Sequence, residues 1–141
     1  YDTMWNGTRV LAENIAAGIR DAAPATTVKL FNAARSDKND IITEIFKSKA
    51  ILVGSPTINR GILTGIAALL EEIKGLKFKG KKAAVFGCYG WSGEGNQLLS
   101  ENLRSAGFEI VGDGLRALWN PDDSAKAAAA AYGRQIAEAL R

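Results

Sequence analysis

Two nearly continuous apolar runs constrain the fold of this chain more than any other feature of its sequence. The first, KAILVGS, covers residues 49–55, and the second, KKAAVFGCYG, covers residues 81–90. Neither run alternates apolar with polar residues, so each is predicted to be a β-strand buried on both faces. Strands of this kind occur in parallel sheets that helices cover on both sides. The two runs therefore predict an α/β protein.

The segments around these runs predict an alternation of helices and strands. Leu11, Ile15 and Ile19 recur every fourth residue of RVLAENIAAGIRDAA and define one helical face. Further helices are predicted over residues 36–48, 61–76, 98–107 and 121–140, and further strands over residues 26–32 and 108–118. Ser36 and Asn120 are the predicted N-caps of the first and last of these four helices. This order predicts a doubly wound parallel sheet in three α/β/α layers.

Composition excludes several classes of function. The chain has 141 residues, 47% of them hydrophobic, which suits one domain with a single core. The net charge of +3 comes from scattered residues and does not indicate nucleic-acid binding. One cysteine and no histidine exclude an internal disulfide and predict no metal site, so the chemistry is expected to come from a bound cofactor. No apolar run is long enough to cross a membrane and no signal segment opens the sequence, which predicts a cytoplasmic protein.

Three loops follow predicted strand ends or open a helix, where doubly wound sheets bind ligands. The opening stretch YDTMWNGT offers the Thr3 and Thr8 hydroxyls and the N–H groups of a helix start, which suit a phosphate; an ordinary N-cap is the alternative. The loop GSPTINRG (54–61) offers polar groups, although a plain strand-to-helix connection would look similar. The loop GCYGWSGEG (87–95) places Tyr89 and Trp91 among glycines, as expected for walls around a flat ring. Together the loops predict a site for flavin mononucleotide (FMN).

The motifs DTMWNGT, GSPTINRG and FGCYGWSGEG resemble the flavodoxin-like domain of flavodiiron proteins, the family of flavorubredoxins and related nitric oxide or oxygen reductases. The resemblance covers essentially the whole chain. It implies that residues 1–141 form a flavodoxin-like FMN domain, a fragment of a larger protein whose metallo-β-lactamase-like domain holds two irons. It also implies the FMN-binding residues: Thr3, Met4, Trp5, Asn6, Gly7, Thr8, Ser55, Pro56, Thr57, Ile58, Asn59, Tyr89, Gly90, Trp91, Ser92 and Gly93.

The family's arrangement assigns each loop a part of the cofactor. Residues 3–8 would hold the phosphate, residues 56–59 would line the ribityl chain and one ring edge, and the loop containing Tyr89 and Trp91 would surround the isoalloxazine. Arg60 is either a cation near the ring edge that favours the reduced anionic flavin or a solvated loop residue. Cys88 is interpreted as a small buried residue rather than a redox thiol.

The function implied by the resemblance is electron transfer. FMN would take electrons from a reduced partner, such as a rubredoxin-type donor, and pass them to a diiron site that reduces nitric oxide or oxygen. That site would lie in the same parent chain or in a neighbouring subunit of a head-to-tail homo-oligomer. No catalytic side chain is expected, so the domain alone would be an electron carrier and its parent a flavodiiron oxidoreductase.

Three other functions are alternatives to electron transfer. A stand-alone FMN-dependent NAD(P)H or quinone reductase would need a nicotinamide pocket, for which the sequence has no motif. A phospho-acceptor receiver domain needs an aspartate at the end of the central strand, where this chain has Gly54-Ser55-Pro56. A flavodoxin-like scaffold without cofactor stays open.

The opening stretch raises a question about the sheet. A phosphate loop should follow the first strand, and in the flavodoxin order 2-1-3-4-5 that strand lies inside the sheet. With Tyr1 as the first residue, the strand is expected to be missing from the sequence. The chain is therefore expected to be a piece of a longer polypeptide, or to take the strand from elsewhere, since an open position would leave backbone groups unpaired.

Overall fold

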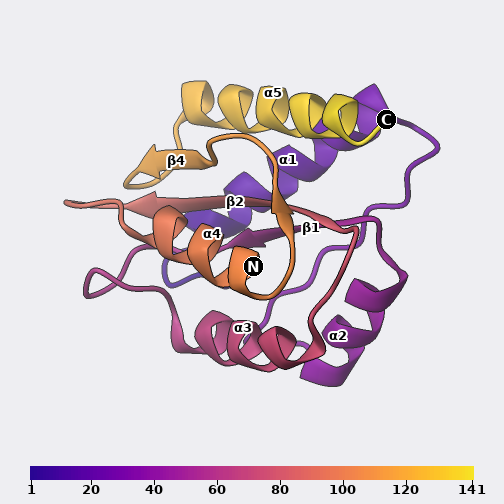
Figure 1. Cartoon of the computed structure of the whole chain (residues 1–141). Coiled ribbons are helices and arrows are strands. Elements are labelled where there is room, and N and C mark those ends of the chain that lie inside the picture. Colours follow the sequence, from indigo (N-terminus) through magenta and orange to yellow (C-terminus); the bar gives the residue numbers. More distant parts are fainter.

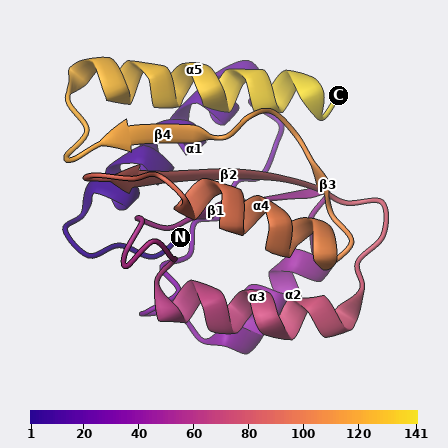
Figure 2. The same cartoon turned by 60° about the vertical axis from the view of Figure 1, so that its left-hand side comes forward.

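The computed structural model describes residues 1–141 and has the predicted alternation of helices and strands. The elements in chain order are α1 (Gly7–Ala22), α2 (Lys38–Lys47), β1 (Ala50–Gly54), α3 (Thr64–Leu76), β2 (Lys82–Tyr89), α4 (Gly95–Ser105), β3 (Glu109–Ile110), β4 (Leu115–Leu118) and α5 (Asp123–Ala139). Figure 1 shows α1 and α5 on one face of the sheet and α2, α3 and α4 on the other, and the view in Figure 2 agrees. The predicted three-layer, flavodoxin-like α/β fold is confirmed.

The centre of the sheet is β2, which pairs in parallel on both sides. β1 runs along one side, and β3 and β4 pair with the two halves of the other side. Residues 83–88 of β2 are all buried, which confirms the prediction from its apolar run. In β1, Val53 and Gly54 are buried whereas residues 50–52 are only half-buried, because an open groove runs along the strand's free edge.

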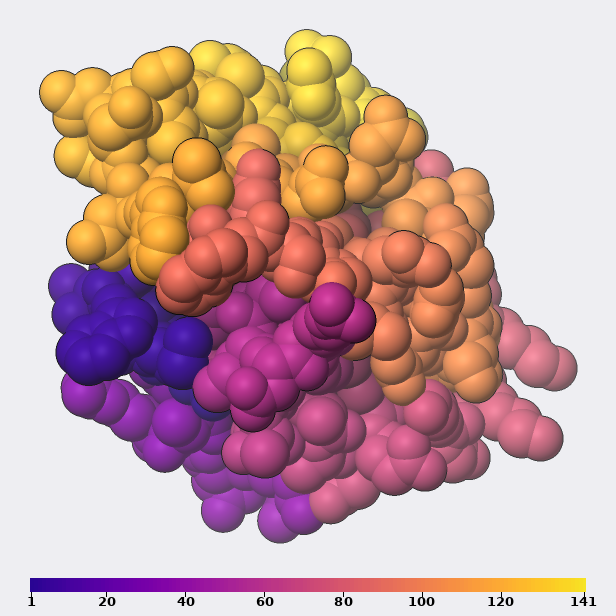
Figure 3. Space-filling model, turned by 90° about the vertical axis from the view of Figure 1, so that its left-hand side faces the viewer, coloured from indigo at the N-terminus to yellow at the C-terminus, as the bar shows by residue number.

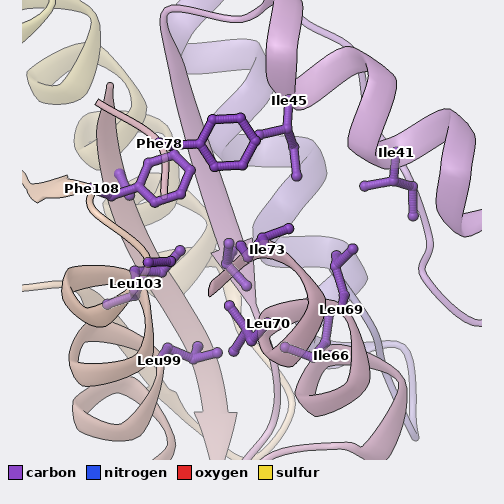
Figure 4. Packing of buried hydrophobic residues seen from close by; sticks show 14 residues of the cluster. Ile41, Ile45, Ile66, Leu69, Leu70, Ile73, Phe78, Leu99, Leu103 and Phe108 are labelled. Atoms are coloured by element: carbon purple, nitrogen blue, oxygen red, sulfur yellow. The ribbon is translucent and has the colours of Figure 1, made fainter. Parts of the chain in front are cut away.

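Two hydrophobic clusters hold the layers together. One lies between the sheet and α2, α3 and α4, and Figure 4 shows side chains from these helices meeting in it. The Phe78 and Phe108 rings join this cluster, with 5.2 Å between their centroids and a tilt of 47°. The other lies between the sheet and the pair α1 and α5. Both clusters reach the strands, so the sheet is held rigidly between them.

Glycines allow α1 and α5 to pack closely. A Cβ at Gly18 would lie 2.0 Å from the Ala130 carbonyl oxygen, and a Cβ at Gly133 would lie 2.1 Å from the Ile15 carbonyl oxygen. Side chains at these two positions would therefore separate the helices. The close packing fixes the direction of α1, whose first turn lies at the candidate site.

The strand predicted over residues 26–32 is not formed, because these residues make no hydrogen-bonded ladder. Residues 27–32 are irregular, and a cavity of about 640 Å³ lies between them, β1 and α1. A strand needs a hydrogen-bonded neighbour, and nothing fills the position beside this segment. The segment therefore borders an open slot rather than a neighbouring strand.

The first two residues show which position in the sheet the slot represents. The Tyr1 amino group donates to the Phe31 carbonyl at 2.9 Å, and the Ala33 N–H donates to the Tyr1 carbonyl at 2.8 Å. On the other side, the Asp2 N–H donates to the Gly54 carbonyl at 3.0 Å. Residues 1–2 therefore lie between the segment before α2 and β1, as the order 2-1-3-4-5 requires of the end of its first strand. Figures 1 and 2 accordingly place the N-terminus beside the sheet.

Three local predictions were wrong. The strand predicted over residues 108–118 is split into β3 and β4. Gly112 and Gly114 lie between these two strands, and their positive φ angles of 71° and 82° interrupt the hydrogen bonding to β2. The N-cap of α2 is Asp37, whose carboxylate accepts from the Asn39 N–H, and not Ser36. The N-cap of α5 is Asp122, which accepts from the Ala125 N–H. Asn120 therefore does not cap α5, and it borders the candidate site.

Candidate cofactor site

Four loops meet at the carboxyl edge of the sheet. Figure 3 looks onto this edge and shows the indigo N-terminal segment, the magenta segment after β1, the salmon segment after β2 and the orange segment after β4 lying side by side. They enclose a cavity of about 340 Å³, a size within the range of cofactor sites. Its lining residues are Thr3, Met4, Trp5, Gly7, Thr8, Pro56, Thr57, Cys88, Tyr89, Gly90, Trp91, Trp119 and Asn120.

Backbone hydrogen bonds extend the sheet into these loops. The Thr57 N–H donates to the Cys88 carbonyl at 2.9 Å, so the loop after β1 stays beside β2. On the other side, the Trp119 N–H donates to the Tyr89 carbonyl at 2.8 Å. The Gly95 N–H donates to the Thr57 hydroxyl at 3.1 Å and adds the start of α4. The loops are therefore held by the same ladder that holds the strands.

One end of the cavity has unpaired hydrogen-bond donors. The Thr3 and Thr8 hydroxyls are buried and have no hydrogen-bond partner. They lie at the start of α1, whose first N–H groups have no acceptor within the helix and whose N-cap, Asn6, makes no side-chain capping bond. Buried polar groups are rarely left unpaired, so this arrangement fits a ligand that accepts several hydrogen bonds, such as a phosphate.

Aromatic rings line another part of the cavity. The Trp91 and Trp119 rings meet edge to face at 5.1 Å between centroids, and Tyr89 lines the same cavity. Trp91 is 88% exposed and Trp5 is 82% exposed, so the core of the domain uses neither ring. Large apolar rings left at the mouth of a cavity are typical of a surface that receives a flat ligand.

Six of the residues predicted from the sequence do not line the cavity. Some of them shape the loops instead. Ser55 is buried, its hydroxyl donates to the Pro56 carbonyl, and it accepts from the Leu63 N–H at 3.0 Å, which joins the loop to α3. Ile58 and Asn59 belong to a tight turn in which Ile58 bridges Gly61 and Asn59 takes a φ of 49°.

The other three lie at the edges of the site. Asn6 is the exposed, left-handed N-cap of α1, with a φ of 65°. Ser92 hydrogen-bonds Glu94, which together with the charge of Arg60 holds the pKa of that carboxyl below its ordinary value. Gly93 lies where a Cβ would be 2.8 Å from the Arg116 guanidinium. Arg60 is exposed, and its charge acts on Glu94.

Sequence reasoning missed Trp119 and Asn120, which line the cavity from the loop after β4. The signal was present, because this loop follows a strand at the same edge as the others. The sequence pattern instead favours Asn120 as a helix cap.

Cys88 lies at the bottom of the cavity, beneath α1. A Cβ at Gly7 would be 3.0 Å from the Cys88 sulfur, so the start of α1 packs directly against the thiol. Burial raises the pKa of Cys88, and the neighbouring Thr8 hydroxyl opposes this shift. The thiol is therefore protonated at neutral pH, consistent with the interpretation as a small buried residue.

Comparison with known families identifies the fold and its cofactor. The family model described as flavodoxin matches residues 1–133. The chain belongs to the flavodoxin family. FMN, the cofactor predicted from the sequence, is the cofactor of this family.

Individual flavodoxin-like proteins refine this assignment. The chain is 49% identical over 138 residues to the anaerobic nitric oxide reductase flavorubredoxin of Aliivibrio fischeri, and 48% identical over 137 residues to that of Pectobacterium carotovorum. These matches cover 98% and 97% of this chain but only 28% and 27% of the relatives.

Solved structures give the same result. Rubredoxin oxygen:oxidoreductase of Desulfovibrio gigas superimposes with a TM-score of 0.93 at 36% identity, over 99% of this chain and 34% of that one. An archaeal flavodoxin superimposes with a TM-score of 0.86 at 29% identity, over 98% of this chain and 93% of that one. The resemblance to the flavodoxin-like part of flavodiiron proteins is confirmed.

The residues present fit FMN. Unpaired hydroxyls and helix N–H groups at one end suit its phosphate, and aromatic rings at the other end suit its isoalloxazine. No three His, Cys, Asp or Glu side chains come together in a cluster that could hold a metal ion. None of the helices is long and apolar enough to cross a lipid bilayer.

Replacing Thr8 with valine distinguishes a role of the Thr8 hydroxyl in phosphate binding from a role in folding. Val is nearly isosteric and removes a buried hydroxyl without a partner, so the unfolding free energy of the FMN-free T8V variant should stay the same or rise by about 1 kcal/mol. Loss of a donor to a charged phosphate should weaken FMN binding by roughly 10-fold or more, measured by flavin fluorescence titration.

Riboflavin, which lacks the phosphate, provides the ligand control, and T43V on α2 provides the protein control. Riboflavin affinity should be the same in T8V and the parent protein, and T43V should bind FMN like the parent. An equal loss of FMN and riboflavin affinity in T8V would show that Thr8 does not act on the phosphate.

Proposed function

We propose that residues 1–141 bind one FMN at the carboxyl edge of the sheet and act as the electron-carrying domain of a flavodiiron protein. Electrons would come from a reduced partner such as a rubredoxin-type protein and go to a diiron site that reduces nitric oxide or oxygen. That site would lie in a metallo-β-lactamase-like domain of the same parent chain or of a neighbouring subunit. A cytoplasmic location, as predicted from the sequence, is part of the proposal.

The observation that carries the FMN site is a single cavity with unlike ends. Thr3 and Thr8 place unpaired hydroxyls at one end, and Tyr89 and Trp91 place aromatic rings at the other. Pro56 and Thr57 line the same cavity. FMN has the same sequence of groups: a phosphate, a polar ribityl chain and a flat ring.

The protein's own residues would bind and orient the cofactor. FMN itself would supply the redox chemistry, taking up and releasing electrons. Thr3, Thr8 and the start of α1 would hold the phosphate by charge-assisted hydrogen bonds. Tyr89 and Trp91 would cover the ring and exclude water, while the exposed mouth of the cavity would leave a ring edge accessible to redox partners. No proton transfer by a side chain is needed for this role.

Membership of a larger flavodiiron protein is supported by the length of the match. The relatives are over three times as long as the segment this chain matches, and one of the matched structures is named as a rubredoxin oxygen:oxidoreductase.

Titration of the purified protein with FMN tests the binding half of this proposal. We expect saturation at one FMN per chain, quenched flavin fluorescence, perturbed visible flavin bands and quenched tryptophan fluorescence. Unperturbed bands and unquenched fluorescence at high protein concentration would refute it and favour a scaffold without cofactor.

Electron transfer is tested with the FMN-loaded protein in two anaerobic mixtures. Reduced rubredoxin should reduce the bound flavin rapidly, followed by the loss of flavin absorbance, whereas NADH alone should reduce it no faster than it reduces free FMN. Rapid reduction by NADH alone would contradict the carrier role and support a stand-alone NAD(P)H reductase.

A further inference from the structure

Trp119, directly after β4, has an unusual backbone conformation. Its φ of 53° lies in the left-handed region, where a bulky side chain is a genuine outlier. Burial of the ring does not compensate for this, because Trp119 remains 58% exposed. Strained backbone at an exposed aromatic residue indicates a position selected for what its side chain does, since such strain concentrates at binding and catalytic sites.

The surroundings of Trp119 hold its ring at the cavity. The backbone bond from its N–H to the Tyr89 carbonyl anchors the residue to the loop after β2. The ring packs directly over Gly90, where a Cβ would lie 3.0 Å from the indole, and it meets the Trp91 ring edge to face. Gly90 is therefore a position where any side chain would displace the Trp119 ring.

The residues after Trp119 reach the opposite end of the cavity. Asn120 and Pro121 lie against Gly7 at the start of α1, with the Asn120 side-chain oxygen 3.7 Å and the Pro121 ring 3.3 Å from a Cβ placed there. The loop thus spans from the aromatic end to the phosphate end. Trp119 and Asn120 both line the cavity.

We infer that Trp119 contacts the cofactor, its indole forming with Trp91 the apolar wall that receives the isoalloxazine ring. This inference rests on the proposed FMN function and adds a fourth loop to the three identified from the sequence. The strained backbone of Trp119 is maintained because only this conformation places the indole over Gly90 and beside Trp91. Asn120 adds a polar group beside Gly7 at the start of α1, where the phosphate would lie.

Substitution of Trp119 by glycine distinguishes the effect of the indole ring on FMN binding from the effect of the strained backbone on stability. W119G removes the indole and also the strain, so the FMN-free variant should unfold at the same or a higher urea concentration than the parent. If the indole contacts FMN, W119G should bind FMN at least 10-fold more weakly by flavin fluorescence titration. W119F keeps an aromatic ring and should remain within threefold of the parent.

The neighbouring residue offers a matched control. Leu118 is 56% exposed, almost the same as Trp119, and does not line the cavity, so L118A should bind FMN like the parent. W119N, which also tolerates the left-handed conformation, replaces W119G if the glycine variant does not fold.

Parent-like FMN affinity in W119G or W119N would overturn the inference while leaving the FMN function intact. Failure of the parent protein itself to bind FMN would refute the proposed function, so the two failures are distinguishable. A weakened affinity in both W119G and L118A would also overturn the inference, because it would show a general disturbance of the loop.

Discussion

The structure depends on the hydrogen-bonded ladder of the buried strand β2. Its backbone groups lie away from water between two layers of helices and must be paired within the protein. β1 pairs with one edge, and β3 and β4 pair with the other. The pairing continues past the strand ends, through Thr57 to Cys88 and through Trp119 to Tyr89. The requirement to pair the central strand therefore also brings the loops of the candidate site together.

The parts of this architecture that follow from apolar patterning could be predicted from the sequence. The run over residues 81–90 indicated β2 and its burial on both faces, and four-residue spacing indicated α1 and its buried side. The clustering of the loops followed from the fold rule that strand ends share one edge. Gly90, Trp91 and Thr8 were found in this way, because their positions depend on chain order and on little else.

The remaining features depend on contacts between distant segments. Residues 27–32 have the composition of a strand but form no ladder, since hydrogen bonding requires a neighbour that composition does not reveal. Asp37 rather than Ser36 caps α2 because the helix begins at Lys38, and two glycines with positive φ divide the last strand. The backbone strain of Trp119 and its contact with Trp91 exist only in the folded protein, so the sequence shows only that its loop follows a strand.

The central claim is that this edge of the sheet is an FMN site with a phosphate end and an aromatic end. A crystal structure of the protein with FMN tests it most directly. The account predicts the phosphate oxygens within hydrogen-bond distance of the Thr3 and Thr8 hydroxyls, and the isoalloxazine ring against the tryptophan pair. A flavin bound elsewhere, or one bound here with both threonine hydroxyls still unpaired, would contradict it.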